Sequence, residues 1–274
     1  MEPKDLQTLV EIAGAFGGAK MATKLLGPTL EYFGKGLKEF TEKRFENVKS
    51  IFLKAAKRFP TKDEDELTAA NPNLVKTVLD YGSYTEDALI QEYLAGLLIS
   101  SRIGMNNDNR SAVYAKLIEN LSVYQIRTHY LIYTLFRKKY LGMNISINIQ
   151  VNRSKLQFYI PFSIFERYVL SSDEEKTLSN SLVDHSIHGL VRNYLIEQNL
   201  VIGSPEHIAA ELKTNKPKEH GIVIQPSVFG IELFLWVSSI GKDIQINKVL
   251  DPNIFIPELV DFSKININDI YPCP

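Results

Sequence analysis

One stretch of helical periodicity, which starts just after Gly27-Pro28, constrains this chain more than any other feature. Pro28 suits the first turn of a helix, and the apolar residues that follow repeat at helical spacing. These residues are Leu30, Phe33, Leu37, Phe40, Val48, Ile51, Phe52, Ala55 and Phe59. A helix of about 30 residues is roughly 45 Å long at 1.5 Å per residue, which exceeds the diameter of a small domain. We therefore predict a helical arm whose apolar stripe packs against more than one compact core.

The opposite face of this arm is basic. Between positions 35 and 58, eight Lys and Arg residues stand against three Glu residues, a local balance of +5. Such a helix is typical of contact with a partner groove or an anionic membrane surface, and a G-x-x-x-G spacing upstream permits close helix approach. The candidate contact residues are Gly14, Gly18, Lys35, Lys38, Lys43, Arg44 and Lys49. The alternative is that the stripe packs on the chain's own helices or on a second copy.

Composition shifts divide the chain into four predicted regions. An acidic connector at 62–66 follows the arm, and short helices fill the chain from there to about Tyr140. Thr85 is the expected N-cap of a buried helix, and Ser122 with Gln125 is expected to form a capping box. The predicted regions are a helical arm (1–60), a helical core (61–141), an α+β module (142–249) and a C-terminal arm (250–274).

The third region differs in its sequence pattern, because apolar and polar residues alternate between Ile145 and Ile160. This alternation, with a turn at 152–154, predicts a β-hairpin. The elements expected after it are a short helix at about 163–168, a helix at about 178–198, a strand at 221–224 and a closing helix at 229–240. This order is typical of a winged-helix-like module. The predicted fold class is therefore mainly α with a minor β part (α+β).

One cluster of metal-ligand residue types lies on the predicted helix 178–198. His185 and His188 share a helix face, with Asp184 adjacent, so two imidazoles are spaced to reach one metal ion. In a winged helix, the face with His185, His188 and Arg192 would instead touch phosphates or base edges. The alternative is a solvated face, because it lies opposite the apolar stripe and no dense basic patch surrounds it.

Composition and motifs exclude several classes of function. The net charge of −1 provides no global attraction to nucleic acid or membranes, and a single cysteine, Cys273, excludes a multi-cysteine metal site. No phosphate-binding loop, G-x-S-x-G elbow, H-E-x-x-H or dinucleotide fingerprint is present. We therefore expect no cofactor and no metal, and we lean against catalysis. An enzyme site assembled around Asp184 and His188 stays as an alternative.

The expected location is the cytoplasm. No apolar run reaches the ~18 residues of a membrane span, and the first residues lack the features of a secretory signal. Peripheral contact with the inner membrane remains open through the arm.

The segment from about Ala19 to Leu135 resembles the abortive-infection alpha (Abi-alpha) family of bacterial proteins. The likeness is carried by the following stretches: Leu25 to Glu31 with Gly34; Asn71-Pro72-Asn73-Leu74; Thr85 to Leu98, where Tyr93 stands in place of the usual Trp; and Leu117 to Ser122 with Gln125-Ile126. The resemblance implies a role in bacterial defence against phage, in which the infected cell is sacrificed or arrested. It implies no reaction and no catalytic residue.

The sequence thus favours an anti-phage protein that acts by binding a partner or a membrane surface through its arm. The alternative is a nucleic-acid-binding regulator that uses the winged-helix-like module. Self-association through the arm is compatible with both, because an exposed apolar stripe of this size is normally covered.

Overall fold

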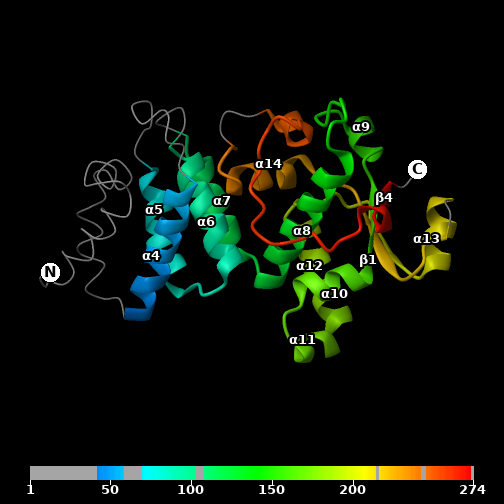
Figure 1. The fold of residues 1–274 in the computed structure, drawn as a ribbon, viewed down its shortest axis with the longest axis horizontal. Helices are drawn as coiled ribbons and strands as arrows, with labels where there is room; N and C mark the ends of the chain where they lie inside the picture. Colours follow the sequence, from blue (N-terminus) through cyan, green and yellow to red (C-terminus); the bar gives the residue numbers. More distant parts are fainter. Residues whose placement is uncertain (1–41, 59–69, 103–107, 214–215, 242–244, 273–274) are drawn as a thin grey trace, which may run out of the picture. The chain divides into compact units, whose positions relative to one another are not determined.

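The computed structural model describes residues 42–58, 70–102, 108–213, 216–241 and 245–272. The fold is mainly helical with one small antiparallel sheet, which confirms the predicted α+β class (Figure 1). The chain forms two compact units. Unit 1 comprises Met1–Asn120 and Trp236–Ile244, and unit 2 comprises Leu121–Leu235 and Gln245–Pro274. These limits differ from the boundaries predicted at 60, 141 and 249.

Unit 1 contains the first described elements, which are α4 (Glu42–Lys57), α5 (Pro72–Asp80), the 3-10 helix η4 (Gly82–Tyr84), α6 (Ala88–Ser100) and α7 (Arg110–Asn120). The helices that follow are α8 (Val123–Tyr140), α9 (Gln150–Ser154), α10 (Phe162–Val169), α11 (Asp173–Thr177), α12 (Ser179–Arg192), α13 (Pro205–Leu212), α14 (Val228–Val237), η5 (Ile246–Leu250) and η6 (Ile267–Asp269). The strands are β1 (Phe158–Pro161), β2 (Val201–Gly203), β3 (Gly221–Ile224) and β4 (Tyr271–Pro272).

Helix α6 is the centre of unit 1. Only Ala88 and Glu92 among its residues are not buried, as expected for a helix that is apolar on every side. Its N-cap is Asp87, whose carboxylate accepts hydrogen bonds from the backbone N–H groups of Leu89 and Ile90. The prediction of Thr85 as N-cap is wrong, because the Thr85 hydroxyl donates to the carbonyl of an earlier turn instead.

Helix α4 packs on α6 and is part of the same core (Figure 1). The apolar stripe at Val48, Ile51, Phe52 and Ala55 is fully buried. Burying four such side chains stabilises the unit by several kcal/mol, at about 1.5–3 kcal/mol for each large one. The described part of the predicted arm is therefore a core helix. The predicted helix before residue 42 and the acidic connector at 62–66 lie outside the described residues.

Unit 2 is built around α8, which α10 and α12 cover. The predicted capping box is confirmed: the Ser122 hydroxyl accepts from the Gln125 N–H, and the Gln125 side chain accepts from the Ser122 N–H. Aromatic side chains fill the interior, with Tyr133 and Phe234 stacked at a centroid distance of 6.0 Å. The partition places α8 with this unit and not with the predicted core at 61–141.

The sheet has the strand order β2-β3-β1-β4, and each neighbouring pair is antiparallel. Strand β3 lies at the predicted position 221–224. The predicted hairpin between Ile145 and Ile160 is wrong: helix α9 occupies the expected turn, and β1 pairs with β3 and β4, which are distant in sequence. The sheet therefore joins three separate stretches of the chain.

The C-terminal segment 250–272 belongs to unit 2 and contacts α8. Arg137 on α8 donates to the backbone carbonyls of Val249 and Ile254, and the Tyr130 hydroxyl accepts from the N–H of Leu259 at 2.5 Å. The ring of Phe262 is buried against Tyr130. These contacts fix the segment that forms one wall of the pocket described below.

Candidate functional site

The basic residues of α4 meet partners within unit 1. Lys43 forms an ion pair with Glu86 at 2.5 Å, and both side chains are exposed. The Arg44 guanidinium lies 3.9 Å from the centroid of the Tyr84 ring, a cation–π contact. These two candidate contact residues are thus engaged by the neighbouring η4 and α6 region.

Three further basic residues of this stretch also pair with carboxylates, whereas Lys57 is exposed and has no ion pair among the described residues. Lys49 pairs with Glu46 on its own helix at 3.3 Å. Lys54 and Arg58 both pair with Glu92, which is the acidic residue of α6. Burial, followed by the charge of Arg58, lowers the pKa of Lys54. The basic face predicted for the arm is therefore largely neutralised in its described part.

The other predicted contact residues of the arm, Gly14, Gly18, Lys35 and Lys38, lie outside the described residues. Within the part of the chain that the structure describes, no helix combines the length and apolarity needed to cross a bilayer. The arm hypothesis therefore rests on residues 1–41 alone.

The second predicted face lies on α12 and is exposed. Ser181, His185, His188 and Arg192 follow one another at spacings of three and four residues, so they share one side of the helix. His185 lies 3.1 Å from the Ser122 hydroxyl through Nε2. Arg192 and His188 have no hydrogen bond or ion pair to any residue that the structure describes. Of these four side chains, only His185 has a hydrogen-bond partner among the described residues.

Large apolar side chains are exposed at both ends of this row. Leu178, directly before α12, is 59% exposed, and Tyr194, two residues after the last residue of α12, is 70% exposed. Tyr194 adopts the left-handed conformation with φ of 57°, and the Leu195 N–H returns to the Leu190 carbonyl at 2.8 Å. The Ser227 hydroxyl donates to the Tyr194 carbonyl at 2.7 Å. Glycine is the usual residue at such a helix end, so the sequence keeps a tyrosine there at an energetic cost.

The charge of this surface is mixed. Asp184 lies beside the row, and α11 carries Asp173 and Glu174 immediately upstream. No group of three or more His, Cys, Asp or Glu side chains able to hold a metal ion occurs among the described residues. The alternative of a metal site on Asp184, His185 and His188 therefore gains no support.

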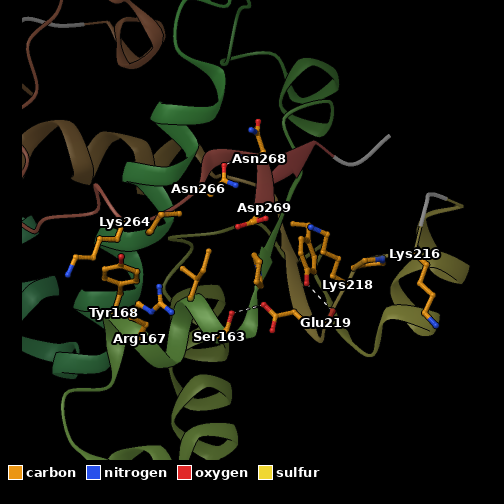
Figure 2. A pocket seen from close by; sticks show the side chains of 15 residues that line it. Ser163, Arg167, Tyr168, Lys216, Lys218, Glu219, Lys264, Asn266, Asn268 and Asp269 are labelled. Atoms are coloured by element: carbon orange, nitrogen blue, oxygen red, sulfur yellow. Dashed lines mark hydrogen bonds between the residues drawn. The ribbon is translucent and has the colours of Figure 1, made fainter.

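A pocket of about 580 Å³ opens elsewhere on unit 2. Its walls come from β1 and α10, from the segment 216–219 before β3, and from the segment 264–269 (Figure 2). Pockets of 300–1,000 Å³ are typical of small-molecule sites. The space is therefore large enough for a ligand of cofactor size.

Hydrogen bonds hold the floor of this pocket. The Ser163 hydroxyl donates to the Glu219 carboxylate at 2.6 Å, and the Tyr159 hydroxyl donates to the Glu219 carbonyl at 2.9 Å (Figure 2). Lys216 forms an ion pair with Glu206 on α13 and points away from the other labelled side chains. Tyr159 is buried in the sheet, so this part of the pocket is preformed.

Three further cations line the pocket, namely Arg167, Lys218 and Lys264. The Tyr168 hydroxyl is buried and has no hydrogen-bond partner among the described residues. Its ring packs edge-on against Phe262 at 5.0 Å between centroids. A buried hydroxyl without a partner is uncommon in folded proteins and marks a position where a ligand or water would be accommodated.

The sequence predicted the row on α12 but missed its apolar ends and the pocket. Tyr194 follows no glycine or proline signal that would mark a helix end. The pocket joins three stretches that no local spacing relates. Comparison with known proteins finds no matching family model, no similar curated protein and no similar solved structure.

Proposed function

We propose that this chain is a non-catalytic defence protein that binds a partner protein through an exposed row on α12. The row consists of Leu178, Ser181, His185, His188, Arg192 and Tyr194, and we refer to it as the α12 row. The anti-phage role rests on the resemblance of residues 19–135 to the Abi-alpha family. The binding mode rests on the surface of unit 2.

The observation that carries the proposal is the exposed Tyr194 in a strained backbone conformation. A non-glycine residue in the left-handed region costs of order 1 kcal/mol or more, and such strain clusters at functional positions. Tyrosine is enriched among the residues that dominate binding energy at protein interfaces. An exposed tyrosine kept at this cost is best explained by a contact outside the chain.

The charge of the surface favours a protein partner over nucleic acid. Nucleic-acid binding relies on several phosphate contacts from Lys and Arg. The α12 row offers Arg192 and two histidines, against Asp184 and the acidic α11. The row instead combines exposed apolar side chains with few charges, and it contains a tyrosine and an arginine, two residue types that are enriched in protein interfaces.

Phage challenge of a bacterial host tests both parts of the proposal. Cells carrying the intact gene are compared with cells carrying no gene, at low and high phage-to-cell ratios. We expect protection at the low ratio and collapse of the culture at the high ratio. Absence of protection against a broad phage panel would contradict the defence role.

Two variants then locate the acting surface. A His188→Glu and Arg192→Glu double variant introduces negative charge at two exposed positions and leaves the core intact, and we expect it to lose protection. Deletion of residues 1–41 spares α4, whose stripe belongs to the core of unit 1. Loss of protection in the deletion alone would move the effector step to the arm, where flotation with anionic liposomes tests membrane contact.

A second candidate function is nucleic-acid binding by a winged-helix-like module, and the topology favours it. The element order is α8, α9, β1, α10, α11, α12, β2, α13, β3, and β3 lies between β2 and β1 in the sheet, so two helices followed by a small antiparallel sheet support this interpretation of unit 2. In helix-turn-helix proteins the second helix of the motif enters the major groove, and α12 holds the equivalent place after α10.

The salt dependence of binding tests this second candidate. Fluorescence anisotropy with labelled duplex DNA at several salt concentrations gives the number of phosphate contacts. Phosphate binding by the row predicts a steep slope that falls by about 1 when Arg192 is changed to Ala. A flat slope, or one that Arg192→Ala leaves unchanged, would rule out this use of α12.

A further inference from the structure

We propose that the pocket formed by β1, α10 and the segments 216–219 and 264–269 binds a phosphorylated small molecule of about mononucleotide size. The pocket is lined by residues outside the α12 row, so the inference does not depend on the proposed function. Its support comes from the size of the space, the charges around it and one buried polar atom.

The size of the pocket favours a ligand larger than a bare ion. A volume of about 580 Å³ falls in the range that small-molecule sites occupy and far exceeds what inorganic phosphate alone would fill. Apolar surface from Pro161, Ile164 and Ile265 contributes to the lining beside the polar groups. A ligand here therefore has an uncharged body as well as a charged group.

The cations favour a phosphate as that charged group. Arg167 and Lys218 lie on either side of the Ser163–Glu219 hydrogen bond (Figure 2). Neither forms a hydrogen bond or ion pair with any residue in the described ranges, and both are exposed. A guanidinium binds two phosphate oxygens at once, and charge-assisted bonds of this kind are about twice as strong as neutral ones.

The opposite wall supplies groups that suit hydroxyl and amino donors. Asp269 presents a carboxylate, which only accepts hydrogen bonds when ionised. The Asn266 side-chain oxygen accepts from the N–H of Asn268 at 3.0 Å, which leaves its NH₂ group to donate. A ligand with a phosphate at one end and hydroxyl or amino groups at the other satisfies both walls. Nucleotides have this chemistry.

The Tyr168 hydroxyl is the most specific part of the site. It is buried at the pocket wall without a partner among the residues that the structure describes, although burial of an unpaired hydroxyl is unfavourable. A ligand that accepts its hydrogen bond would remove this penalty. If Tyr168 had only a structural role, phenylalanine would fill the same space without burying an unpaired hydroxyl.

Isothermal titration calorimetry with the full chain tests the proposal. The phosphorylated probes are the four ribonucleoside monophosphates, the four triphosphates and ribose 5-phosphate. Adenosine and inorganic phosphate are the comparison probes. We expect at least one phosphorylated probe to bind at least tenfold more tightly than either comparison probe. If all phosphorylated probes fail to bind at millimolar concentration, the proposal is overturned.

Three variants connect the binding to this pocket. Arg167→Glu should lower the affinity for the probe at least tenfold. Tyr168→Phe should weaken it severalfold without lowering the melting temperature of the free protein, because no hydrogen bond within the described structure is lost. Lys155→Glu is the matched control, because Lys155 is exposed and is not among the residues that line the pocket, and this variant should bind the probe normally.

The variants also separate the pocket from other cationic surfaces. Binding that survives both Arg167→Glu and Tyr168→Phe would place the ligand elsewhere and contradict the proposal. Binding that Lys155→Glu abolishes to the same extent as Arg167→Glu would mean a diffuse charge effect, with the same conclusion. Phage protection is not part of this readout, so failure here is distinguishable from failure of the proposed function.

Discussion

Helices α4 of unit 1 and α12 of unit 2 are both amphipathic, yet they differ in what their polar faces contact. In α4 the charged residues Lys43, Lys49, Lys54 and Arg58 all pair with carboxylates of the same unit. In α12, by contrast, the exposed His188 and Arg192 have no hydrogen bond or ion pair to any described residue. The comparison teaches that a basic amphipathic pattern identifies a helix face, but neighbouring residues decide whether that face is available.

The two helices also differ in how strain is distributed. The α4 stripe is buried without an unusual backbone conformation, and α6 beneath it is closely packed. Helix α12 ends in a left-handed tyrosine that contributes an exposed ring. This contrast supports the proposal that α12, and not α4, presents a binding face. The following predictions test this contrast.

The largest effect is expected from overpacking unit 1 at Gly96. A Cβ atom at this position of α6 would overlap the backbone carbonyl of Val237, which cannot move as a flexible side chain would. Gly96→Ala should destabilise unit 1 by about 3 kcal/mol or more. Trp236 is the only tryptophan of the chain and belongs to unit 1, so its fluorescence in urea reports the change.

Gly142→Ala provides the control for this prediction. Gly142 has φ of 85° and open space around it, so a Cβ there adds backbone strain but no overlap. Gly142 belongs to unit 2, where its cost should be only about 1 kcal/mol, as measured by hydrogen exchange of peptides from that unit. Equal and small costs for the two variants would contradict close packing around α6.

The second effect concerns the pH dependence of unit 2. His129 is fully buried, and burial lowers its pKa to about 4, although a hydrogen bond to the Gly230 carbonyl acts in the opposite direction. The unfolded chain binds this proton near pH 6.5, so the folded state loses stability as the pH falls from 6.5 to 4. The loss should approach about 3 kcal/mol.

Hydrogen exchange of the α8 peptides between pH 4 and 7, corrected for the intrinsic exchange rate, checks this prediction. His129→Gln should remove most of the pH dependence, since glutamine does not titrate. His188→Gln at an exposed position of α12 is the matched control and should leave it unchanged. A pH dependence that survives His129→Gln would assign it to another group.

The third effect separates stability from binding at the end of α12. Tyr194→Gly relieves the left-handed strain and should stabilise unit 2 by about 1 kcal/mol. Lys213 adopts the same conformation, with φ of 51°, after α13, so Lys213→Gly should give a similar gain. Exchange of peptides from unit 2 measures both. A loss of stability in Tyr194→Gly alone would show that the tyrosine ring is structural.

The smallest effect is expected on the exposed face of α4. The Lys43–Glu86 pair is solvent-exposed on both sides, and such pairs contribute less than about 1 kcal/mol. Lys43→Ala should change the urea midpoint by little and leave phage protection unchanged. A strong loss of protection with unchanged stability would return the binding role to α4.

Much of the helical framework was predictable from the sequence. The periodicity predicted α4, α6 and α14, and the Ser122–Gln125 pair predicted the start of α8, because these signals act over a few residues. The prediction of Thr85 as N-cap was wrong, because Asp87 is also a capping residue and only the contacts in the fold decide between the two. Asp87 accepts two N–H groups, while Thr85 bonds backward.

The hairpin predicted between Ile145 and Ile160 does not form, because the pairing of β1 depends on segments that are distant in the sequence. Ile149 and Val151 belong to the apolar alternation but are exposed, and Arg153 in the expected turn is buried with its guanidinium on the carbonyl of Ile147. Strand β1 finds its partners from β3 and β4, so its register depends on distant segments. The pocket and the conformation of Tyr194 arise in the same way, from contacts that no sequence spacing encodes.

The most direct test of the account is the plating efficiency of phage on hosts that carry Tyr194→Gly or Lys213→Gly. Both variants relieve the same backbone strain, but only the first removes a side chain of the α12 row. The account predicts that Tyr194→Gly loses at least tenfold of the protection while Lys213→Gly keeps it. Full protection with Tyr194→Gly, in a gene that protects when intact, would contradict partner binding through α12.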